Sequence, residues 1–456
     1  MTPFDSAGSR RAQARPGGPR VAVVHDWLTG MRGGEKVLEA ICELFPRAEL
    51  YTLVRVPNTV SPALEARSIR SSAVDRLPAV GRFYRHLLPL FPAVVETFDL
   101  DRYDLVISSS HCAVKSVIRS GRAVHICYCH SPMRYAWDQF HAYFGPDQVG
   151  RVAHTLLRPV LAALARWDAA TAGRVDVYVA NSRYVAGRIR RYYNRGSTVV
   201  YPPVDTEFYR LPDSAVLQGQ HRTSGAERPA PNRERRAPSA QRPGFLVVSA
   251  LVPYKKIDVA IDACRAAGAP LKVVGSGPEL ARLQRRAGAD VEFLGWRSNE
   301  EIRELYQWAT AVLLPGVEDF GLVPVEAQAC GCPVVALGAG GACETVVDGE
   351  TGVLVPDGSV EALTAGLHRA LKIQFDPAAI RNHALRFSRD RFKTDFSAVV
   401  EDALTSGAGG PGAGISGREY QPPSRPLDAR GRQHQPPSSP QDVHGREYRP
   451  PSRTNK

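Results

Sequence analysis

Two series of short apolar segments most strongly constrain the fold of this 456-residue chain. The first opens with RVAVVHDWL at 20–28, which runs into the glycine-rich loop TGMRGGEK and then the helical pattern EKVLEAICELF. Strand, glycine loop and helix in this order are typical of the start of a Rossmann-like unit. Further strands of this series are predicted at 103–110, 123–130, 175–182 and 197–204. Alternating strands and helices predict a parallel sheet covered by helices.

The second series repeats this alternation after a long segment without hydrophobic periodicity. Its strands are predicted at 244–251, 270–278, 291–295, 310–316, 333–341 and 351–356. We therefore expect an α/β protein with two Rossmann-like domains, at 20–210 and 244–375. C-terminal helices are predicted at 376–404. They either stay on the second domain or cross back to the first.

The remaining segments are rich in Pro, Gly, Ser and Arg. They comprise an N-terminal tail at 1–19, a linker or insertion at 211–243 and a C-terminal tail at 405–456. Residues 1–20, 211–243 and 405–456 together carry +10 of the +12 net charge, so the folded part is close to neutral. We expect these segments to be disordered and the protein not to bind nucleic acid.

The C-terminal tail contains a repeated octapeptide. The copies GREYQPPS, GRQHQPPS and GREYRPPS begin at 417, 431 and 445, a spacing of 14 residues. Such Pro-rich repeats have no core to bury, so they carry no predicted chemistry. Docking of a partner protein is the alternative role considered for them.

The cysteines and the apolar segments of the sequence predict the cellular compartment of the protein. The eight cysteines are scattered, and Cys127-x-Cys129 and Cys330-x-Cys332 lack the two-residue spacer of common zinc pairs, so we expect buried thiols in a reducing compartment. No export signal precedes the first strand, and no apolar run reaches the roughly 18–20 residues needed to cross a bilayer. The predicted location is cytoplasmic, with peripheral contact to the inner face of the plasma membrane as an option.

Segment 80–98, VGRFYRHLLPLFPAVVETF, underlies that option because it mixes Arg and His with large apolar residues. It predicts either an interfacial patch for a lipid-linked acceptor or ordinary helices packed on the first domain.

Two glutamates flank a mostly apolar stretch in GVEDFGLVPVEAQACGCPVVA, residues 316–336. Glu318 follows a predicted strand, and Glu326 lies about one turn into the next predicted helix. In parallel sheets ligands bind at the carboxyl ends of strands, where a carboxylate can accept hydrogen bonds from a ribose diol and helix amides suit a phosphate. The alternative is two solvated charges on a surface helix, which the apolar neighbours disfavour.

The pair Glu318-x7-Glu326 resembles the signature of retaining glycosyltransferases of family 4. The segments SALVPYKKID, VVGSGP, VEFLGW and GGACETVVDGETGVLV resemble that family in order and spacing, as do HDWLTGMRGGEKVL and YCHSPMRYAWD in the first half. The resemblance covers roughly 20–400 without the linker, and the first half is most similar to mannosyltransferases that build bacterial surface polysaccharides.

This resemblance implies a GT-B fold, in which two Rossmann-like domains face each other across a cleft. The second domain would bind the nucleotide-sugar and the first the acceptor. Glu326 would bind the ribose, Glu318 the donor sugar hydroxyls and Lys255 the diphosphate. Phe320, Gly321 and Leu322 would line the same pocket, and Gly277 of the VVGSGP motif would also contact the donor. Where the family usually has an Arg, five residues before this Lys, the chain has Ala250, so Lys256 or an Arg elsewhere would have to substitute.

In the first domain, Gly33 and Gly34 are predicted to let the backbone approach the diphosphate at a helix start. His130 matches the active-site histidine of the family, which contacts the donor sugar near the reacting carbon. The alternative is that His130 has only a structural role, as a histidine at a strand end usually does; the surrounding motif favours the active-site role. Asp26 and Arg134 are weaker candidates in the same cleft.

Two other motifs are rejected. Asp99-x-Asp101 has the spacing of a metal motif but precedes a strand, so a solvated turn is expected. GSGPEL at 275–280 lacks a convincing third glycine and downstream acidic residue of a dinucleotide fingerprint, which disfavours hydride transfer. No metal or other cofactor is expected.

The predicted activity is transfer of a hexose, with mannose from GDP-mannose as the favoured donor, to a glycan or lipid-linked acceptor with retention at the anomeric carbon. Alternatives are a UDP-sugar glycosyltransferase, a nucleotide-sugar epimerase or a phosphorylase of the same fold. A non-catalytic nucleotide-sugar-binding protein is the alternative outside enzymes.

Overall fold

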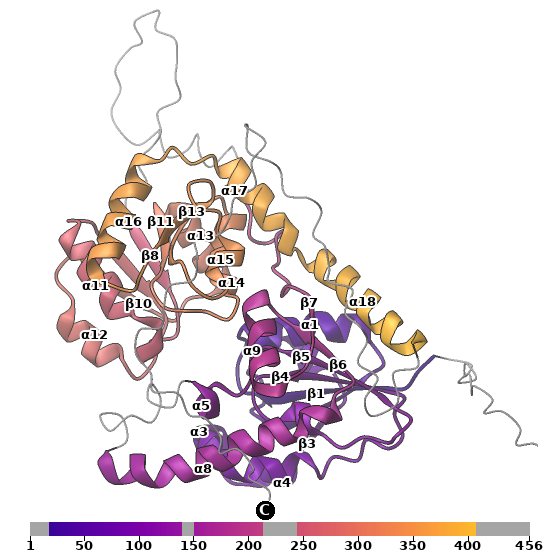
Figure 1. Ribbon diagram of the computed structural model, residues 1–456. Helices are drawn as coiled ribbons and strands as arrows, with labels where there is room; N and C mark the ends of the chain where they lie inside the picture. Colours follow the sequence, from indigo (N-terminus) through magenta and orange to yellow (C-terminus); the bar gives the residue numbers. More distant parts are fainter. Residues whose placement is uncertain (1–17, 139–149, 213–243, 407–456) are drawn as a thin grey trace, which may run out of the picture. The chain divides into compact units, whose positions relative to one another are not determined.

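A computed structural model describes residues 18–138, 150–212 and 244–406 (Figure 1). Most of the predicted disordered segments, including all of the repeated octapeptides, fall outside these residues. Within the described part the chain forms two parallel sheets, one of seven strands and one of six. The described chain therefore has the predicted two Rossmann-like units.

The first sheet has the strand order β3-β2-β1-β4-β5-β6-β7, with every pairing parallel. In the register, Val23 pairs with Leu50 on one side and with Ile107 on the other. The strands are β1 (Val21–Leu28), β2 (Glu49–Arg55), β3 (Ile69–Ser71), β4 (Leu105–Ser110), β5 (Val124–Cys129), β6 (Val177–Ala180) and β7 (Thr198–Val199). The sequence analysis did not predict β2 and β3, because ELYTLVR carries a Thr among its buried positions and β3 is only three residues long.

The helices of the first half are α1 (Gly33–Leu44), α2 (Pro62–Glu65), α3 (Val80–Phe83), α4 (Phe91–Val95), α5 (Arg134–Trp137), α8 (Arg151–Ala170) and α9 (Arg183–Tyr193). Short 3-10 helices are η1 (Ala73–Arg76), η2 (Tyr84–Leu90), η3 (Val114–Ser116) and η4 (Thr171–Arg174). Alternate residues of β1 enter different cores: Ala22 and Val24 pack with η2, α4 and α8, whereas Val23 packs with α1. This alternation follows from the period of two along a strand and gives the sheet two covered faces.

The second sheet has the order β10-β9-β8-β11-β12-β13, again with parallel pairings. Its strands are β8 (Phe245–Val248), β9 (Leu271–Val274), β10 (Val291–Gly295), β11 (Ala311–Leu314), β12 (Val334–Leu337) and β13 (Gly352–Val355). Its helical segments are η5 (Pro253–Lys255), α11 (Ile257–Ala266), α12 (Leu280–Arg286), α13 (Asn299–Trp308), α14 (Leu322–Ala329), α15 (Ala342–Thr345), α16 (Val360–Lys372), α17 (Pro377–Ala384) and η6 (Leu385–Phe387). Helices α11 and α16 lie side by side over one face, and α13 and α14 cover the other (Figure 1).

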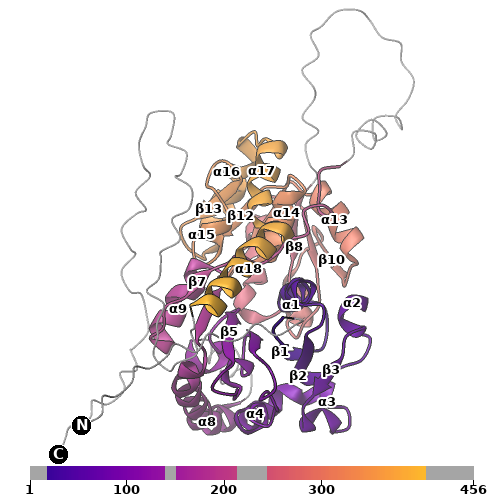
Figure 2. The same ribbon diagram turned by 90° about the vertical axis from the view of Figure 1, so that its right-hand side faces the viewer.

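The last helix, α18 (Arg389–Thr405), packs on the first domain beside α1 (Figures 1 and 2). Phe392 and Phe396 enter the core under Tyr128 of β5, with ring centroids 5.7 and 6.1 Å from the tyrosine ring. Arg389 forms ion pairs with Glu39 at 3.0 Å and with Glu43 at 2.5 Å, both on α1. The chain thus returns from the second sheet to the first, so both ends of the described fold belong to one domain.

None of the eight cysteines, all of which lie in the described residues, forms a disulfide, and seven of them are buried. The expectation of buried thiols is wrong for Cys343, which is exposed because α15 is a four-residue helix with one face toward solvent. Burial raises the pKa of Cys42 to about 11 and that of Cys264 to about 12, so these thiols are inert at neutral pH. Asp99 and Asp101 are exposed in the turn before β4, as predicted.

Buried histidines predict a loss of stability in mild acid. Burial lowers the pKa of His125 to about 3, and burial followed by the charge of Arg386 lowers that of His383 to about 4. The unfolded chain takes up these protons near pH 6.5 and the folded chain does not, so stability is full above pH 6.5 and falls below it. We expect the free energy of unfolding to fall by about 1.4 kcal/mol per pH unit for each such group.

Urea denaturation at pH 7.5, 6.5 and 5.5 measures this slope. His125 is the residue to substitute, because both of its ring nitrogens have a defined partner. Arg174 O accepts from its Nδ1 at 3.1 Å, and Ser108 Oγ donates to its Nε2 at 2.8 Å. The Gln amide lies at the position of Nε2 and its oxygen can accept from Ser108, so His125→Gln removes the titrating group while it keeps this contact, and the pH dependence is expected to fall by about one proton. An unchanged slope in this variant would contradict the assignment.

Candidate active site

Each sheet brings functional loops together where its strand order reverses. In the first sheet β1 lies between β2 and β4, and in the second β8 lies between β9 and β11. The loops after these central strands lead away on opposite sides and leave a crevice at the carboxyl edge, where ligands bind in open parallel sheets. Most of the predicted site residues lie in loops or helix starts after β1, β5, β8, β9 and β11, and they are described below domain by domain.

The two glutamates of the second domain are paired with lysines. Glu318 follows β11 and forms an ion pair with Lys255 of η5. Glu326 lies in α14, only 5% exposed; it accepts from Lys36 Nζ of α1 at 2.6 Å and from Tyr306 OH of α13 at 3.2 Å. The alternative of two solvated surface charges is therefore wrong, since α14 buries the side of the helix that carries Glu326.

The loop that carries Glu318 is held by a second glycine loop. The Gly341 amide donates to Glu318 O at 2.8 Å, and a Cβ on Gly341 would lie 2.4 Å from Phe320 Cα. Only a residue without a side chain allows this approach. Gly321 has φ +86°, a left-handed conformation that also favours glycine, and it precedes the first residue of α14. The GGACE and DFGL motifs thus form one structural unit.

Phe320 and Leu322 of this unit pack against the same core but differ in their other contacts. Phe320 is 2% exposed and packs between Tyr201 and Phe387, with ring centroids 5.6 and 5.5 Å apart. Its side chain supports the loop from the core and does not line an open pocket in this structure. Leu322 also reaches the first domain, where its Cδ1 is 3.1 Å from the position of a Cβ on Gly33.

The glycine pair of the first domain lies against His130. A Cβ on Gly34 would be 3.5 Å from His25 Cε1 and 3.7 Å from His130 Nε2. Gly33 and Gly34 open α1, so their amides lie at a helix N-terminus that favours negative charge. The structure thus brings together the predicted Gly33, Gly34, His130 and Leu322.

His130 ends a buried polar chain that the sequence analysis missed. Its Nε2 is 2.8 Å from Ser109 Oγ, which is 3.1 Å from His25 Nδ1. His25 Nε2 lies 3.9 Å from Glu35 Oε1, too far for a hydrogen bond but close enough for a charge interaction. His25 within β1, Ser109 within β4 and Glu35 in the first turn of α1 carry no local signal, and the parallel pairing of β1 with β4 sets His25 beside Ser109.

Electrostatics keep His130 neutral. Burial, followed by the charges of His111 and His25, holds the pKa of His130 well below its usual range. Burial alone would raise the pKa of Glu35, but attraction to His25 outweighs it, so that pKa lies below its usual value. The chain therefore runs from an ionised carboxylate to a neutral imidazole, which can donate or accept one hydrogen bond to a ligand.

Asp26 does not reach the site as an available ligand group. It is fully buried, and its carboxylate accepts from the four amides of His111, Cys112, Ala113 and Val114 at 2.7 to 3.0 Å. His111 Nδ1 lies 3.3 Å from the same carboxylate. The predicted place of Asp26 in the cleft is corrected by this structure, because four backbone donors use its oxygens to hold the loop after β4.

Arg134 is placed against the second domain. Its Nε donates to Asp319 Oδ2 at 2.8 Å, and its guanidinium lies 5.6 Å from the centroid of Tyr254. Burial would lower the pKa of Arg134, but the Asp319 charge outweighs it and raises the pKa. Asp319 also accepts from Ser182 Oγ through its backbone oxygen at 2.6 Å. Arg134 is thus a permanent cation next to the Glu318 loop.

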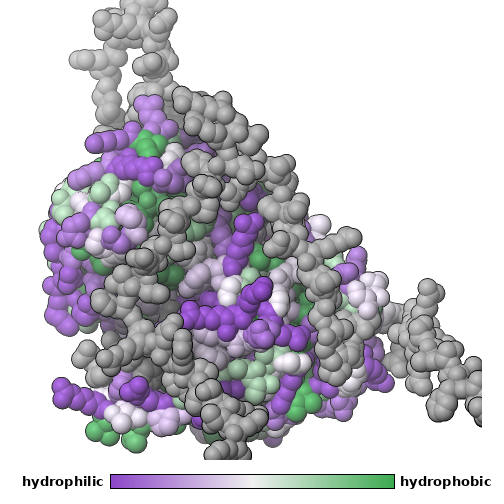
Figure 3. Space-filling model, in the orientation of Figure 1, coloured by the Kyte–Doolittle hydropathy of each residue, from purple (hydrophilic) through white to green (hydrophobic). Residues whose placement is uncertain are grey.

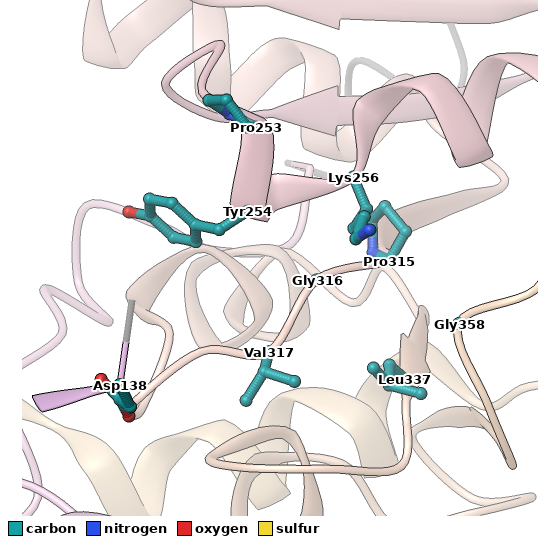
Figure 4. A pocket seen from close by; sticks show the side chains of 9 residues that line it. All are labelled: Asp138, Pro253, Tyr254, Lys256, Pro315, Gly316, Val317, Leu337 and Gly358. Carbon is teal, nitrogen blue, oxygen red and sulfur yellow. The ribbon is translucent and has the colours of Figure 1, made fainter. Parts of the chain in front are cut away.

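A cavity of about 400 Å³ lies at the carboxyl ends of β8, β11 and β12. Figure 4 shows Tyr254, Lys256, Pro315, Val317 and Leu337 around it. Its volume is within the roughly 300–1,000 Å³ of pockets for small molecules and cofactors. Of the two predicted lysines, Lys256 lines this cavity, whereas Lys255 pairs with Glu318.

The position where the family usually has an Arg is exposed. Ala250 lies in the loop after β8, and the same loop passes Gly277, on which a Cβ would be 2.3 Å from Leu251 O. Gly277 therefore allows a close approach of two backbones at this edge. Cations grouped around Tyr254, four residues further along the chain, are Lys255 and Arg134, and Lys256 lines the same cavity as Tyr254.

Segment 80–98 packs as helices on the first domain. Val80, Tyr84, Leu88, Phe91 and Val95 recur at helical spacing and are buried in one core, although Leu90 is 53% exposed. Other exposed apolar side chains are Val152 and Leu156 near the start of α8, where Figure 3 shows hydrophobic atoms at the surface. Within the described ranges, no helix is long and apolar enough to cross a membrane.

Comparisons with known proteins agree with this fold. A family profile described as "Glycosyltransferase Family 4" matches residues 31–208, and one described as "Glycosyl transferases group 1" matches residues 231–387. HepE of Anabaena, solved in complex with UDP, superposes with a TM-score of 0.57 at 20% identity, covering 84% of this chain and 100% of that chain. Fold and site together define a GT-B glycosyltransferase architecture.

Two curated relatives are similar in sequence. A D-inositol 3-phosphate glycosyltransferase of Acidothermus cellulolyticus is 32% identical over 59% of this chain and 68% of its own length. A GDP-mannose-dependent alpha-(1-6)-phosphatidylinositol monomannoside mannosyltransferase of Mycolicibacterium smegmatis is 33% identical over 42% of this chain and about half, 52%, of its own length. The chain belongs to glycosyltransferase family 4.

Proposed function

We propose that this protein is a retaining hexosyltransferase that moves mannose from GDP-mannose to a hydroxyl group of a glycan or lipid-linked acceptor. The observation that carries the proposal is that Glu318 pairs with Lys255 and Glu326 pairs with Lys36 of α1, the helix whose first residues Gly33 and Gly34 lie against Leu322 and His130. The mannosyltransferase relative supports GDP-mannose as donor. We place the reaction in polysaccharide or glycolipid synthesis at the inner face of the plasma membrane.

Each group has a separate task in this proposal. Glu326 would accept from the ribose diol, and Glu318 from the sugar hydroxyls. Lys255, Lys256 and the amides of Gly33 and Gly34 would neutralise the diphosphate. The cavity beside Tyr254 would take the base. Both carboxylates already hold cations, so the donor exchanges its own hydroxyl and phosphate contacts for those ion pairs.

The chemistry needs charge stabilisation more than a nucleophile. As the bond from the anomeric carbon to the diphosphate breaks, the sugar gains oxocarbenium character and the phosphate gains negative charge. Lysines and helix amides meet the second need. The acceptor hydroxyl would attack from the same face and pass its proton to a leaving phosphate oxygen, while neutral His130 hydrogen-bonds the sugar beside the reacting carbon. Glu318 acts as a sugar ligand and forms no covalent bond.

A UDP-sugar is the second candidate donor, because the structural neighbour HepE is solved in complex with UDP-glucose. The two donors are separated by calorimetric titration of GDP-mannose, UDP-glucose and UDP-N-acetylglucosamine in EDTA, followed by anomer-resolved product analysis with candidate acceptors. We expect selective binding of GDP-mannose without metal, and product with the donor's anomeric configuration.

Selective UDP-glucose binding would replace the proposed donor. Donor consumed without an acceptor would identify an epimerase, phosphorylase or hydrolase. Tight binding without turnover on any acceptor would identify a nucleotide-sugar-binding protein. Binding that requires added divalent metal would overturn the metal-free site.

A further inference from the structure

Helix α8 carries a second row of apolar side chains, on its outer face. Its inner face packs on the first domain through Leu161 and Leu164, which lie in one core with residues of α4. Residues at i, i+4, i+7 and i+11 form an outer stripe, and all four are exposed: Val152, Leu156, Pro159 and Ala163. Val152 is 75% exposed and Leu156 is 67% exposed. A helix that only covers a core has a polar outer face, so this stripe indicates a further contact.

Arginines border this apolar stripe on one side. Arg151, Arg158 and Arg166 recur at i, i+7 and i+15, so they form one row, and all three are exposed. The row precedes the stripe by one residue, a rotation of about 100°, which places the two side by side on the helix. The single carboxylate of α8 is that of Asp168, which is fully buried. The outer side of α8 therefore combines apolar atoms with positive charge and presents no negative charge.

The surface beside α8 has a similar character. Figures 1 and 2 both place α8 next to α4 at one edge of the first domain, and η2, which precedes α4, contacts α8. Within η2, the side chains of Arg85, His86 and Leu90 are exposed. Glu96, which follows α4, is paired with Arg174 at 2.6 Å, so its charge is balanced. The basic and apolar surface thus extends from α8 to η2.

We propose that the outer face of α8 docks on an anionic lipid bilayer, with the apolar stripe at the level of the headgroups and the arginines against the lipid phosphates. Helices that lie in a membrane interface combine apolar and basic side chains in this way, and an anionic leaflet attracts arginine. Arginine stems can also cover apolar surface while their guanidinium groups reach phosphate oxygens. A second copy of this chain fits less well, because its own arginine row would meet an identical row.

This proposal assigns the interfacial role mainly to α8, whereas the sequence analysis considered segment 80–98 for it. The regularly spaced apolar residues of that segment are buried in the core of the first domain. Helix α8 is also tied to the loop that carries Arg134: Trp137 Nε1 donates to Asp168 Oδ2 at 2.7 Å, and Trp137 ends α5, which begins with Arg134. A bilayer on this face would therefore lie against the first domain, to which the proposed function assigns the acceptor. Docking itself does not depend on the transfer reaction.

Cosedimentation of the full chain with lipid vesicles tests the apolar stripe. Vesicles of phosphatidylcholine alone are compared with vesicles that also contain phosphatidylglycerol. We expect Val152→Gln/Leu156→Gln to weaken binding to the anionic vesicles at least tenfold. The matched control, Leu371→Gln/Leu404→Gln, changes two exposed leucines on α16 and α18 and is expected to bind as wild type does.

A gain of binding tests the same face with the opposite sign. Leu156→Trp is expected to strengthen binding to the anionic vesicles, because tryptophan favours the interface between membrane and water. Misfolding cannot mimic this specific gain over the wild type when melting temperatures are equal. Weaker or unchanged binding of Leu156→Trp would contradict the proposal.

The arginine row is tested by the charge dependence of vesicle binding. We expect wild type to prefer the vesicles with phosphatidylglycerol at least tenfold, and Arg151→Gln/Arg158→Gln to lose most of this preference. The matched control, Arg191→Gln/Arg285→Gln, removes the same charge from exposed positions on α9 and α12 and is expected to keep it.

Three results would overturn the proposal. The first is no vesicle binding by wild type, and the second is an equal loss in the α8 variants and their controls. The third is a dimer, seen by light scattering without vesicles, that Val152→Gln/Leu156→Gln converts to a monomer, because the stripe would then be covered by a second copy. Vesicle binding is measured without turnover, so failure of docking and failure of the proposed transfer reaction are seen separately.

Discussion

Replacing Glu326 by alanine is expected to weaken binding of the donor nucleotide-sugar roughly 100-fold. A carboxylate that accepts from both ribose hydroxyls makes two charge-assisted hydrogen bonds, each worth about 1.5–3 kcal/mol, and 1.4 kcal/mol corresponds to a factor of ten. Glu326 is buried at 5% exposure, so water cannot replace the lost acceptor easily. Calorimetric titration of GDP-mannose into wild type and variant measures the change.

Tyr306→Phe is the matched control for this prediction. It removes the hydroxyl that donates to Glu326 at 3.2 Å but keeps the carboxylate and the ion pair with Lys36. We expect it to weaken donor binding by roughly fivefold or less, because one hydrogen bond contributes about 1 kcal/mol. If Glu326→Ala binds the donor as tightly as wild type while Tm is unchanged, Glu326 is a structural partner of Lys36 and the proposed donor site is wrong.

Replacing His130 by alanine is expected to lower kcat roughly 100-fold or more, with a smaller effect on donor affinity. Loss of one preorganised hydrogen bond at the reacting centre typically costs a factor of about 10²–10³ in rate. Ser109→Ala tests how much the orientation of His130 contributes, apart from the contact of His130 with the sugar. This variant removes only the hydroxyl 2.8 Å from His130 Nε2 and keeps the imidazole. Its expected loss in kcat is roughly fivefold, from one neutral hydrogen bond.

The pH profile gives an independent check on His130. Its pKa is held well below the usual range, so it stays neutral as the pH falls through 6.5. The rate is therefore expected to show no acid limb from His130 between pH 7.5 and 6. A loss of rate centred near pH 6.5 in wild type that is absent in His130→Gln would contradict this. Equal kcat values for wild type and His130→Ala would make His130 a structural residue.

Motif positions in the site could be predicted from sequence because they are tied to strand ends. Glu318, Lys255 and His130 each follow an apolar segment that forms a strand, and parallel strands collect such loops at one edge. Their roles toward the donor remain predictions. A motif does not predict where each of its side chains lies. Phe320 belongs to the DFGL motif, but its ring is packed in the core.

Long-range pairs could not be predicted, because no local pattern encodes them. Lys36 meets Glu326 across 290 positions, and Arg134 meets Asp319 across 185. The sequence placed Asp26 among the candidate ligands of the cleft. In the structure its carboxylate accepts hydrogen bonds from four backbone amides of the loop after β4. Only strand order, which places β4 beside β1, decides that this loop folds over Asp26.

The amino-acid sequence by itself determined the α/β class, the two alternating series and the family motifs, since hydrophobic period and turn residues act over short distances. Tertiary structure alone decided that α18 returns to the first sheet, that Glu326 is held by Lys36 and Tyr306, and that one apolar stripe of α8 faces solvent. These outcomes depend on which surfaces pack together, and packing joins residues whose separation in the chain carries no signal.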